Sequence, residues 1–298
     1  MAYLFLGYKL YTFDNYAQLL DQLGQMSLSQ IWWLIAIVVL MPLNWVLEAY
    51  KWKRLTANVQ KISIVSSTKA ILAGISTGFF TPNRVGEFVG RVFFLDPENR
   101  KSGVTLSMVN SLTQNLIMAL FGVPACFLYF EMKKHPLDNM LTNYLLGLDA
   151  CILLFGIIYF SLPYISKKFA NYNYTNRITQ FTRCLTNYSS QQLIVIIAIS
   201  FVRYLVFCIQ FYFMLQFFGV EISILQAAVA IPTTYLFVTF TPSFAFSEVA
   251  VRSSYAVLVI GAFSGQVVSI ALAGLCIWLI NFVLPMLAGS IVVITKKV

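Results

Sequence analysis

The stretch FTPNRVGEFVGR, residues 80–91, places two arginines and a glutamate inside a chain that is otherwise mostly apolar. A similar stretch, FTPSFAFSEVAVR, occupies residues 240–252. Both contain Phe-Thr-Pro, a short turn and then Glu-x-x-x-Arg, which gives the pairs Glu87/Arg91 and Glu248/Arg252. Because residues four apart lie on one face of a helix, each pair is predicted to form a salt bridge within its own copy.

The two stretches belong to a longer internal repeat. An offset of 160 residues aligns 55–82 with 215–242 without a gap, and nine of the 28 positions are identical. Internal repeats of membrane transporters are either parallel or inverted in the membrane. We therefore predict a single transmembrane domain, 1–298, with one repeat at about 31–130, a second at about 193–295, and a span and basic cytoplasmic loop at 143–191 between them.

The composition identifies an integral membrane protein. Hydrophobic residues make up 59% of the 298 and charged residues 10%, against roughly 45–50% and about 25% in soluble domains. Several apolar runs reach the roughly 20 residues that a helix needs to cross a bilayer. These runs, which predict an all-α, multi-pass helical bundle in the cell (inner) membrane, are 31–50, 102–130, 143–163, 193–218 and 266–295.

The positive charges predict the topology of the first repeat. The net charge is +9, and the basic residues cluster at the ends of apolar runs, which favours membrane topology over nucleic-acid binding. If 62–82 crossed the membrane, many of these residues would lie outside. If the chain instead turns at Thr81-Pro82 and returns to the same face, most of them, including Lys51, lie inside. We therefore predict a re-entrant helical hairpin here.

The second copy is predicted to be inverted relative to the first. Three spans separate the two copies, so the second hairpin, with its turn at Thr241-Pro242, enters from the opposite face. Irregular backbone at membrane depth is tolerated only where protein or water satisfies its hydrogen bonds. The two turns are therefore expected to face each other across an interior cavity.

The charged residues of the hairpins are the candidate binding site. Arginine suits phosphate because its planar fork donates several hydrogen bonds. The expected ligands are membrane lipids with anionic headgroups, and the predicted binding residues are Arg84, Glu87, Arg91, Glu248, Arg252, Asn110 and Gln114. For Asn110 and Gln114, hydrogen bonding between helices is an equal alternative. Glu48 is expected near the inner mouth, and Arg203 either at the inner interface or in the cavity.

Other features predict no further chemistry. The five cysteines are scattered singly and there is one histidine, His135, so we expect neither a metal site, a disulfide framework nor a cofactor. Residues 1–16 are consistent with an interfacial helix or the tail of a first span. The loop 164–191 is either a basic amphipathic helix on anionic lipid or a solvated connector.

The sequence resembles the flippase-like membrane domain of lysylphosphatidylglycerol synthases (multiple peptide resistance factor) and of stand-alone bacterial and archaeal proteins. The resemblance rests on Glu48-Ala-Tyr-Lys-Trp-Lys-Arg54, on Thr81-Pro-Asn-Arg-Val-Gly-Glu87 with Arg91, and on Phe218-Gly219 with Thr241-Pro242 and Glu248. It implies a lipid-translocating or lipid-binding domain. Two segments depart from the family pattern: 242–248, which is bulkier than the usual glycine-rich motif, and 110–115, which lacks the usual arginine and acidic residue.

Three functions are consistent with these observations. The leading hypothesis is a flippase-like transporter of a phosphate-bearing lipid, either a phospholipid or a polyprenyl-phosphate carrier. The alternatives are an integral membrane phosphatase or transferase acting on a lipid phosphate, and a regulatory subunit that binds lipid without moving it. Against the enzyme, the sequence offers no serine, histidine and carboxylate set for nucleophilic attack.

Overall fold

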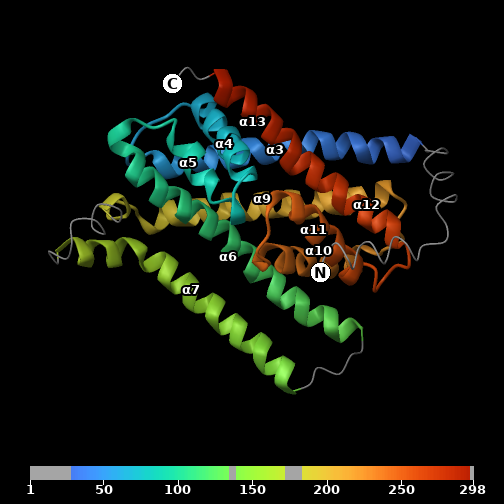
Figure 1. The fold of residues 1–298 in the computed structure, drawn as a ribbon. Helices are drawn as coiled ribbons and strands as arrows, with labels where there is room; N and C mark the ends of the chain where they lie inside the picture. The colour runs from blue at the N-terminus through green and yellow to red at the C-terminus, as the bar shows by residue number, and fades with distance from the viewer. Residues whose placement is uncertain (1–27, 134–138, 172–182, 296–298) are drawn as a thin grey trace. The chain divides into compact units, whose positions relative to one another are not determined.

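The computed structural model describes residues 28–133, 139–171 and 183–295. Over these residues the chain is helical and contains no strand, which confirms the all-α class (Figure 1). Five helical segments within them are long and apolar enough to cross a membrane, and they coincide with the five predicted runs. Their bounds are Gln30–Thr56, Pro97–Met132, Leu146–Lys168, Ser190–Phe217 and Val267–Thr295.

The helices follow the same order in both halves of the chain. The first half contains α3 (Leu28–Thr56), α4 (Ile64–Phe79), η1 (Pro82–Arg84), α5 (Gly86–Val92), η2 (Pro97–Asn99) and α6 (Arg100–Met132). The connecting region contains α7 (Asn139–Asn171) and η3 (Arg183–Leu185). The second half contains α9 (Ser190–Phe217), α10 (Ile224–Phe240), α11 (Ala245–Val259), α12 (Val267–Trp278), the π-turn η4 (Leu279–Val283) and α13 (Leu284–Thr295).

Equivalent serines start the short helix of each half. The Ser63 side chain accepts a hydrogen bond from the backbone N–H of Ser66 at the start of α4. The Ser223 side chain accepts one from Gln226 at the start of α10, 160 residues later. Such N-caps satisfy backbone donors that have no partner within the helix. The repeat therefore extends to local structure, while the inversion of one copy relative to the other stays a prediction.

The chain divides into two compact units, each containing one helical hairpin. The first-hairpin unit comprises Asn44–Leu120, Leu146–Tyr204 and Pro285–Val298. Its apolar core joins α3, α4, α6, α7 and α9 and includes Trp52, Leu55, Ile71, Leu106, Tyr159 and Ile196. The second-hairpin unit comprises Met1–Leu43, Phe121–Leu145 and Leu205–Leu284.

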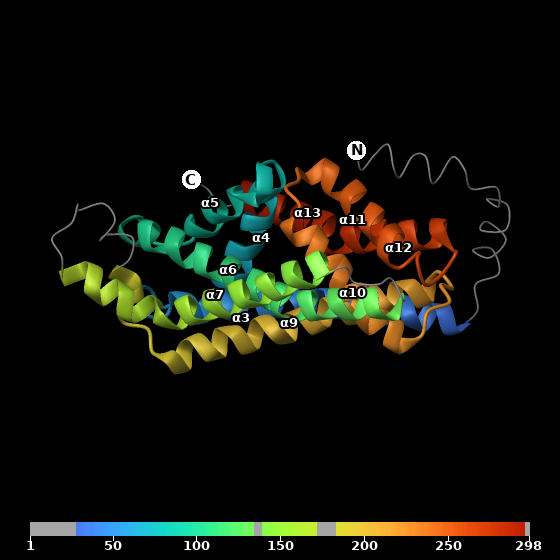
Figure 2. The same cartoon turned by 90° about the horizontal axis from the view of Figure 1, so that it is seen from below.

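The two helices of the first hairpin, α4 and α5, lie side by side (Figures 1 and 2). A Cβ atom at Gly86 would lie 2.4 Å from the carbonyl oxygen of Thr77, and one at Gly90 would lie 2.6 Å from that of Ala73. Real Cβ atoms do not approach backbone this closely, so the hairpin requires glycine at both positions. α13 is equally close to α4, because a Cβ at Gly289 would lie 2.0 Å from the Leu72 carbonyl oxygen.

The second hairpin, α10 and α11, is closed by polar and aromatic contacts. The hydroxyls of Thr241 and Tyr255 are 2.9 Å apart, and the Tyr255 ring stacks on Phe237. α12 packs closely on α11, because a Cβ at Gly274 would lie 3.2 Å from Ser253. A buried α10 completes this unit, with Ala230 and Ile231 almost fully inaccessible.

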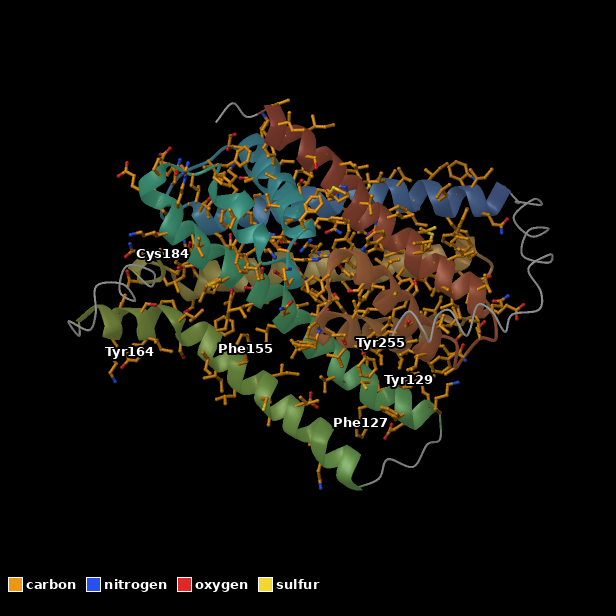
Figure 3. All side chains as sticks on the ribbon, in the orientation of Figure 1. Phe127, Tyr129, Phe155, Tyr164, Cys184 and Tyr255 are labelled. Atoms are coloured by element: carbon orange, nitrogen blue, oxygen red, sulfur yellow. The ribbon has the colours of Figure 1, made fainter. Side chains whose placement is uncertain are left out.

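Large apolar side chains remain exposed along α7, where a bilayer would cover them. Leu153, Ile157 and Tyr164 are each more than half exposed, and Figure 3 shows Tyr164 on this helix. Such a surface is expected for a multi-pass membrane protein. The predicted interfacial segment 1–16, His135 and the centre of the basic loop at 172–182 lie outside the described residues.

Candidate functional site

The first hairpin forms the predicted salt bridge. The Arg91 Nη2 donates to Glu87 Oε2 at 2.7 Å, one helical turn apart on α5. The Arg84 Nη1 lies 3.8 Å from Glu87 Oε1. Two glycines of α4 make room for the pair: a Cβ at Gly78 would lie 2.5 Å from Glu87 Cγ, and one at Gly74 would lie 2.8 Å from Arg91 Cγ.

Glu48 of α3 joins the hairpin to two further cations. Its carboxylate lies 3.1 Å from Arg91 Nη2, 3.1 Å from Lys51 Nζ and 2.9 Å from Arg203 Nη1. The Asn110 side chain of α6 donates to Glu48 Oε1 at 2.7 Å. We call these residues, Arg84, Glu87, Arg91, Glu48, Lys51 and Arg203, the buried charged cluster. It lies entirely within the first-hairpin unit.

Glu48 and Lys51 are enclosed by protein, with 2% and 0% of their surface exposed. Their predicted placement at the inner side of the membrane stays a prediction. The spacing Asn44, Glu48, Lys51 could have indicated this enclosure, because steps of four and three place all three polar side chains on one face of α3.

Arg203 reaches the cluster, where its Nη1 lies 2.9 Å from Glu48 Oε2. Its Nε donates to Asn44 Oδ1 at 2.7 Å, and its Nη1 lies 3.4 Å from Gln114 Oε1. Gln114 in turn donates to the Ser200 carbonyl at 3.4 Å. The two polar residues predicted on α6, Asn110 and Gln114, therefore both contact charged members of the cluster.

Arg91 retains unused hydrogen-bonding capacity. Its residue surface is 3% exposed, and neither Nε nor Nη1 has a hydrogen-bond partner among the described residues. Buried polar groups in native proteins nearly always have partners, so these two unpaired guanidinium nitrogens call for a ligand or water. Within the described part of its unit, the cluster has four cations and two carboxylates, a net formal charge of +2. Such an arrangement can bind an anion.

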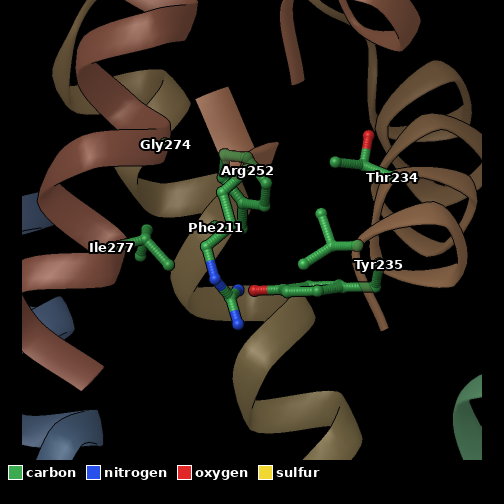
Figure 4. Close-up of a pocket in the computed structure, with 7 residues that line it drawn as sticks. Phe211, Thr234, Tyr235, Arg252, Gly274 and Ile277 are labelled. Carbon is green, nitrogen blue, oxygen red and sulfur yellow. The ribbon is translucent and has the colours of Figure 1, made fainter. Parts of the chain in front are cut away.

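The second hairpin also forms its predicted pair, but in different surroundings. Arg252 Nε and Nη2 both donate to Glu248 Oε1, at 3.0 and 2.8 Å. The guanidinium lies over the Phe282 ring, 4.5 Å from its centre. A small cavity beside Arg252 has space for about one water molecule, about 10 Å³. Figure 4 shows its lining, which includes Phe211, Thr234, Tyr235, Gly274 and Ile277.

The threonines of the two Thr-Pro sequences stabilise the turns between the hairpin helices. Thr81 Oγ1 donates to the Gly78 carbonyl at 3.0 Å and accepts from the Gly86 N–H at 2.8 Å, while Pro82 begins η1. Thr241 Oγ1 donates to the Phe237 carbonyl at 2.7 Å at the end of α10, directly before Pro242. Arg84 has a φ of 59°, a left-handed conformation that is unusual for arginine. That either hairpin is re-entrant stays a prediction.

No curated protein and no solved structure matches the chain. The sequence does match the family described as "Lysylphosphatidylglycerol synthase TM region" over residues 2–292. Together with the apolar helices, this match identifies a lipid-related multi-pass membrane protein. Because the match covers nearly the whole chain, the protein belongs to the lysylphosphatidylglycerol synthase TM region family.

Proposed function

We propose that this protein is a flippase-like transporter that moves a phosphate-bearing lipid between the leaflets of the cell membrane. The observation that carries the proposal is Arg91, a buried guanidinium with two unpaired nitrogens in a cluster of net charge +2. Buried ion pairs are often neutral or destabilising relative to apolar packing. A cluster of six charged side chains, of which Glu48, Lys51 and Arg91 are buried, is therefore better explained by a ligand than by stability alone.

The side chains of the cluster differ in exposure, which supports a mechanism in which a phosphate replaces the Glu87 carboxylate as the partner of Arg91. The side chains of Arg84 and Glu87 are 32% and 15% exposed, whereas that of Glu48 is 3% exposed. Glu87 holds Arg91 through a 2.7 Å ion pair. An arriving phosphate would displace the Glu87 carboxylate and receive hydrogen bonds from Arg91 and Arg84, while Glu48 keeps the other cations in place. The lipid tails would remain in the bilayer.

The family match supports a lipid as the source of that phosphate. Its description names the transmembrane region of a synthase whose product is a phosphate-containing lipid. The exposed apolar faces of the helices suit a ligand whose tails stay in the hydrocarbon while its headgroup enters protein.

Reconstitution in liposomes tests the proposal. Acyl-labelled phosphatidic acid and phosphatidylglycerol would be placed in one leaflet, and extraction by albumin would follow their exchange. We expect the protein to accelerate exchange. Arg91→Lys should slow it, because lysine keeps the charge but loses the planar fork. Arg54→Gln is the matched control, since Arg54 is exposed on α3 and contacts Tyr50 outside the cluster.

Two outcomes would overturn the proposal. One is a folded protein that accelerates exchange of no phosphate lipid, and the other is an Arg91→Lys variant as active as the wild type. Release of inorganic phosphate from phosphatidic acid in the same vesicles would instead identify a lipid phosphatase.

A further inference from the structure

The charge of the buried charged cluster limits which phosphate it can neutralise. Lys51 Nζ lies within reach of three acceptors: Glu48 Oε2 at 3.1 Å, the Asn110 carbonyl at 3.5 Å and Ser200 Oγ at 3.3 Å. An ammonium group has three donors and no acceptor, so this environment suits the charged form. Lys51 is counted as a cation beside Glu48, and the net value of +2 includes it.

The second hairpin does not alter this count. Glu248 and Arg252 pair with each other and add no net charge. At the 160-residue offset, Cys208 and Phe211 stand where the first repeat has Glu48 and Lys51. Phe211 lines the cavity beside Arg252, which holds about one water molecule. At these two aligned positions the second repeat thus has no charged side chain.

We propose, building on the function proposed above, that the lipid bound at the cluster is a phosphate monoester rather than a phosphodiester. A monoester carries about −1.5 to −2 charges at pH 7 and has three terminal oxygens. It would bring the cluster close to neutrality and supply an acceptor for an unpaired nitrogen of Arg91. A phosphodiester carries one charge and would leave one positive charge of the cluster unmatched.

The same reasoning argues against the lipid in the family's name. Lysylphosphatidylglycerol has a phosphodiester and two amino groups, so its headgroup is cationic near neutral pH. A buried cluster of net charge +2 repels such a headgroup. The ligand class of this chain therefore differs from the product named in the family description, and suits lipids such as phosphatidic acid or a polyprenyl monophosphate.

A pair of lipids that differ only at the phosphate tests the inference. Dioleoyl phosphatidic acid is the monoester probe, and dioleoyl phosphatidylmethanol, with the same chains, is the diester. Binding to the purified protein in detergent would be measured by titration at pH 8 and pH 5.5. We expect the monoester to bind at least about tenfold more tightly at pH 8, since one added charge-assisted hydrogen bond accounts for such a factor.

The pH dependence gives a second readout. Below the second phosphate pKa of about 6 the monoester loses its second charge, so the preference should shrink at pH 5.5. Arg84→Asn should also reduce the preference at pH 8, because it removes one cation. Asparagine also tolerates the φ of 59° at this position, so folding should be retained. Arg54→Gln should leave the preference unchanged.

The outcomes separate this inference from the proposed function. Equal affinity for both lipids at pH 8, in a protein that exchanges phospholipids between leaflets, would overturn the monoester preference and leave the transporter intact. A monoester preference without exchange would support the binding site and overturn transport. A preference that survives unchanged at pH 5.5 and in Arg84→Asn would show that charge is not its cause.

Discussion

Glu48 of α3 and Arg91 of α5 form a buried ion pair, with 3.1 Å between Oε1 and Nη2, although they lie far apart in the sequence. Each is also held by a second partner on its own helix, Lys51 for Glu48 and Glu87 for Arg91. The pair therefore connects the hairpin to the long helix that precedes it. Four predictions test this arrangement and the packing around it.

The two carboxylates of the cluster should respond differently to neutralisation. Glu48→Gln leaves Lys51, Arg91 and Arg203 without their shared anion, and breaking a buried pair costs about 3–5 kcal/mol. Glu87→Gln, at a partly exposed position, should cost far less and should tighten lipid phosphate binding because it releases Arg91. Melting temperature and phosphatidic acid affinity measure the two effects. A Glu48→Gln protein as stable as Glu87→Gln would contradict the central position of Glu48.

Gly90→Ala should destabilise the first hairpin. The added methyl would lie 2.3 Å from Thr77 Oγ1 and 2.6 Å from the Ala73 carbonyl, and overpacking of this kind costs about 1–3 kcal/mol. Gly147→Ala on α7 is the matched control, because a Cβ there meets nothing within 4 Å. Helix propensity alone should make that change neutral or stabilising. Thermal unfolding in detergent compares the variants, and equal melting temperatures would count against the close packing.

Tyr188→Phe should lower the free energy of unfolding, because it removes a hydrogen bond between the segment before α9 and the end of α3. The Tyr188 hydroxyl donates to the Leu55 carbonyl at the end of α3, and both residues are buried. Loss of such a hydrogen bond costs about 1 kcal/mol. Burial also raises the pKa of Tyr188 above its ordinary range. The free energy of unfolding should therefore be maintained below about pH 10, the ordinary tyrosine pKa, and decrease as pH rises further.

The phenylalanine variant separates these two effects. It should be less stable than the wild type at neutral pH, yet lose less stability on going to alkaline pH. If both proteins lose the same free energy of unfolding at alkaline pH, a group other than Tyr188 causes that loss. Cys184 is one candidate, since burial raises the pKa of its thiol to about 11.

Cysteine accessibility tests whether the hairpins are re-entrant. Asn83→Cys and Ser243→Cys, each in a protein lacking the five native cysteines, should react poorly with bulky impermeant thiol reagents added from either side. Glu98→Cys on η2, at an exposed position, should react readily from one side only. Strong labelling of Asn83→Cys from the outer face would refute the first re-entrant hairpin.

Local features of the fold could be predicted from the sequence because they depend on local chemistry. Apolar run length predicted the five spans, and the i,i+4 spacing predicted both Glu–Arg pairs. The 160-residue offset also predicted that Ser63 and Ser223 occupy equivalent positions, and both are N-caps.

The composition of the cluster could not be predicted in the same way. Glu48 and Lys51 lie near the end of an apolar run, where charged side chains usually extend to the interface, whereas Arg203 lies at the middle of α9. Their inward direction depends on how α3, α5 and α9 pack, which is a tertiary property. Lys51 in particular followed the expected pattern of a topology-setting charge while being fully enclosed.

The glycines beneath the charged pair have a practical consequence. Arg91 and Glu87 lie over Gly74 and Gly78, which contribute no side-chain volume of their own. A single methyl group at either position would move one charged side chain while leaving the net charge unaltered. Gly74→Ala and Gly78→Ala thus offer a way to vary the distance between guanidinium and ligand independently of electrostatics, which no charge-removing substitution can do.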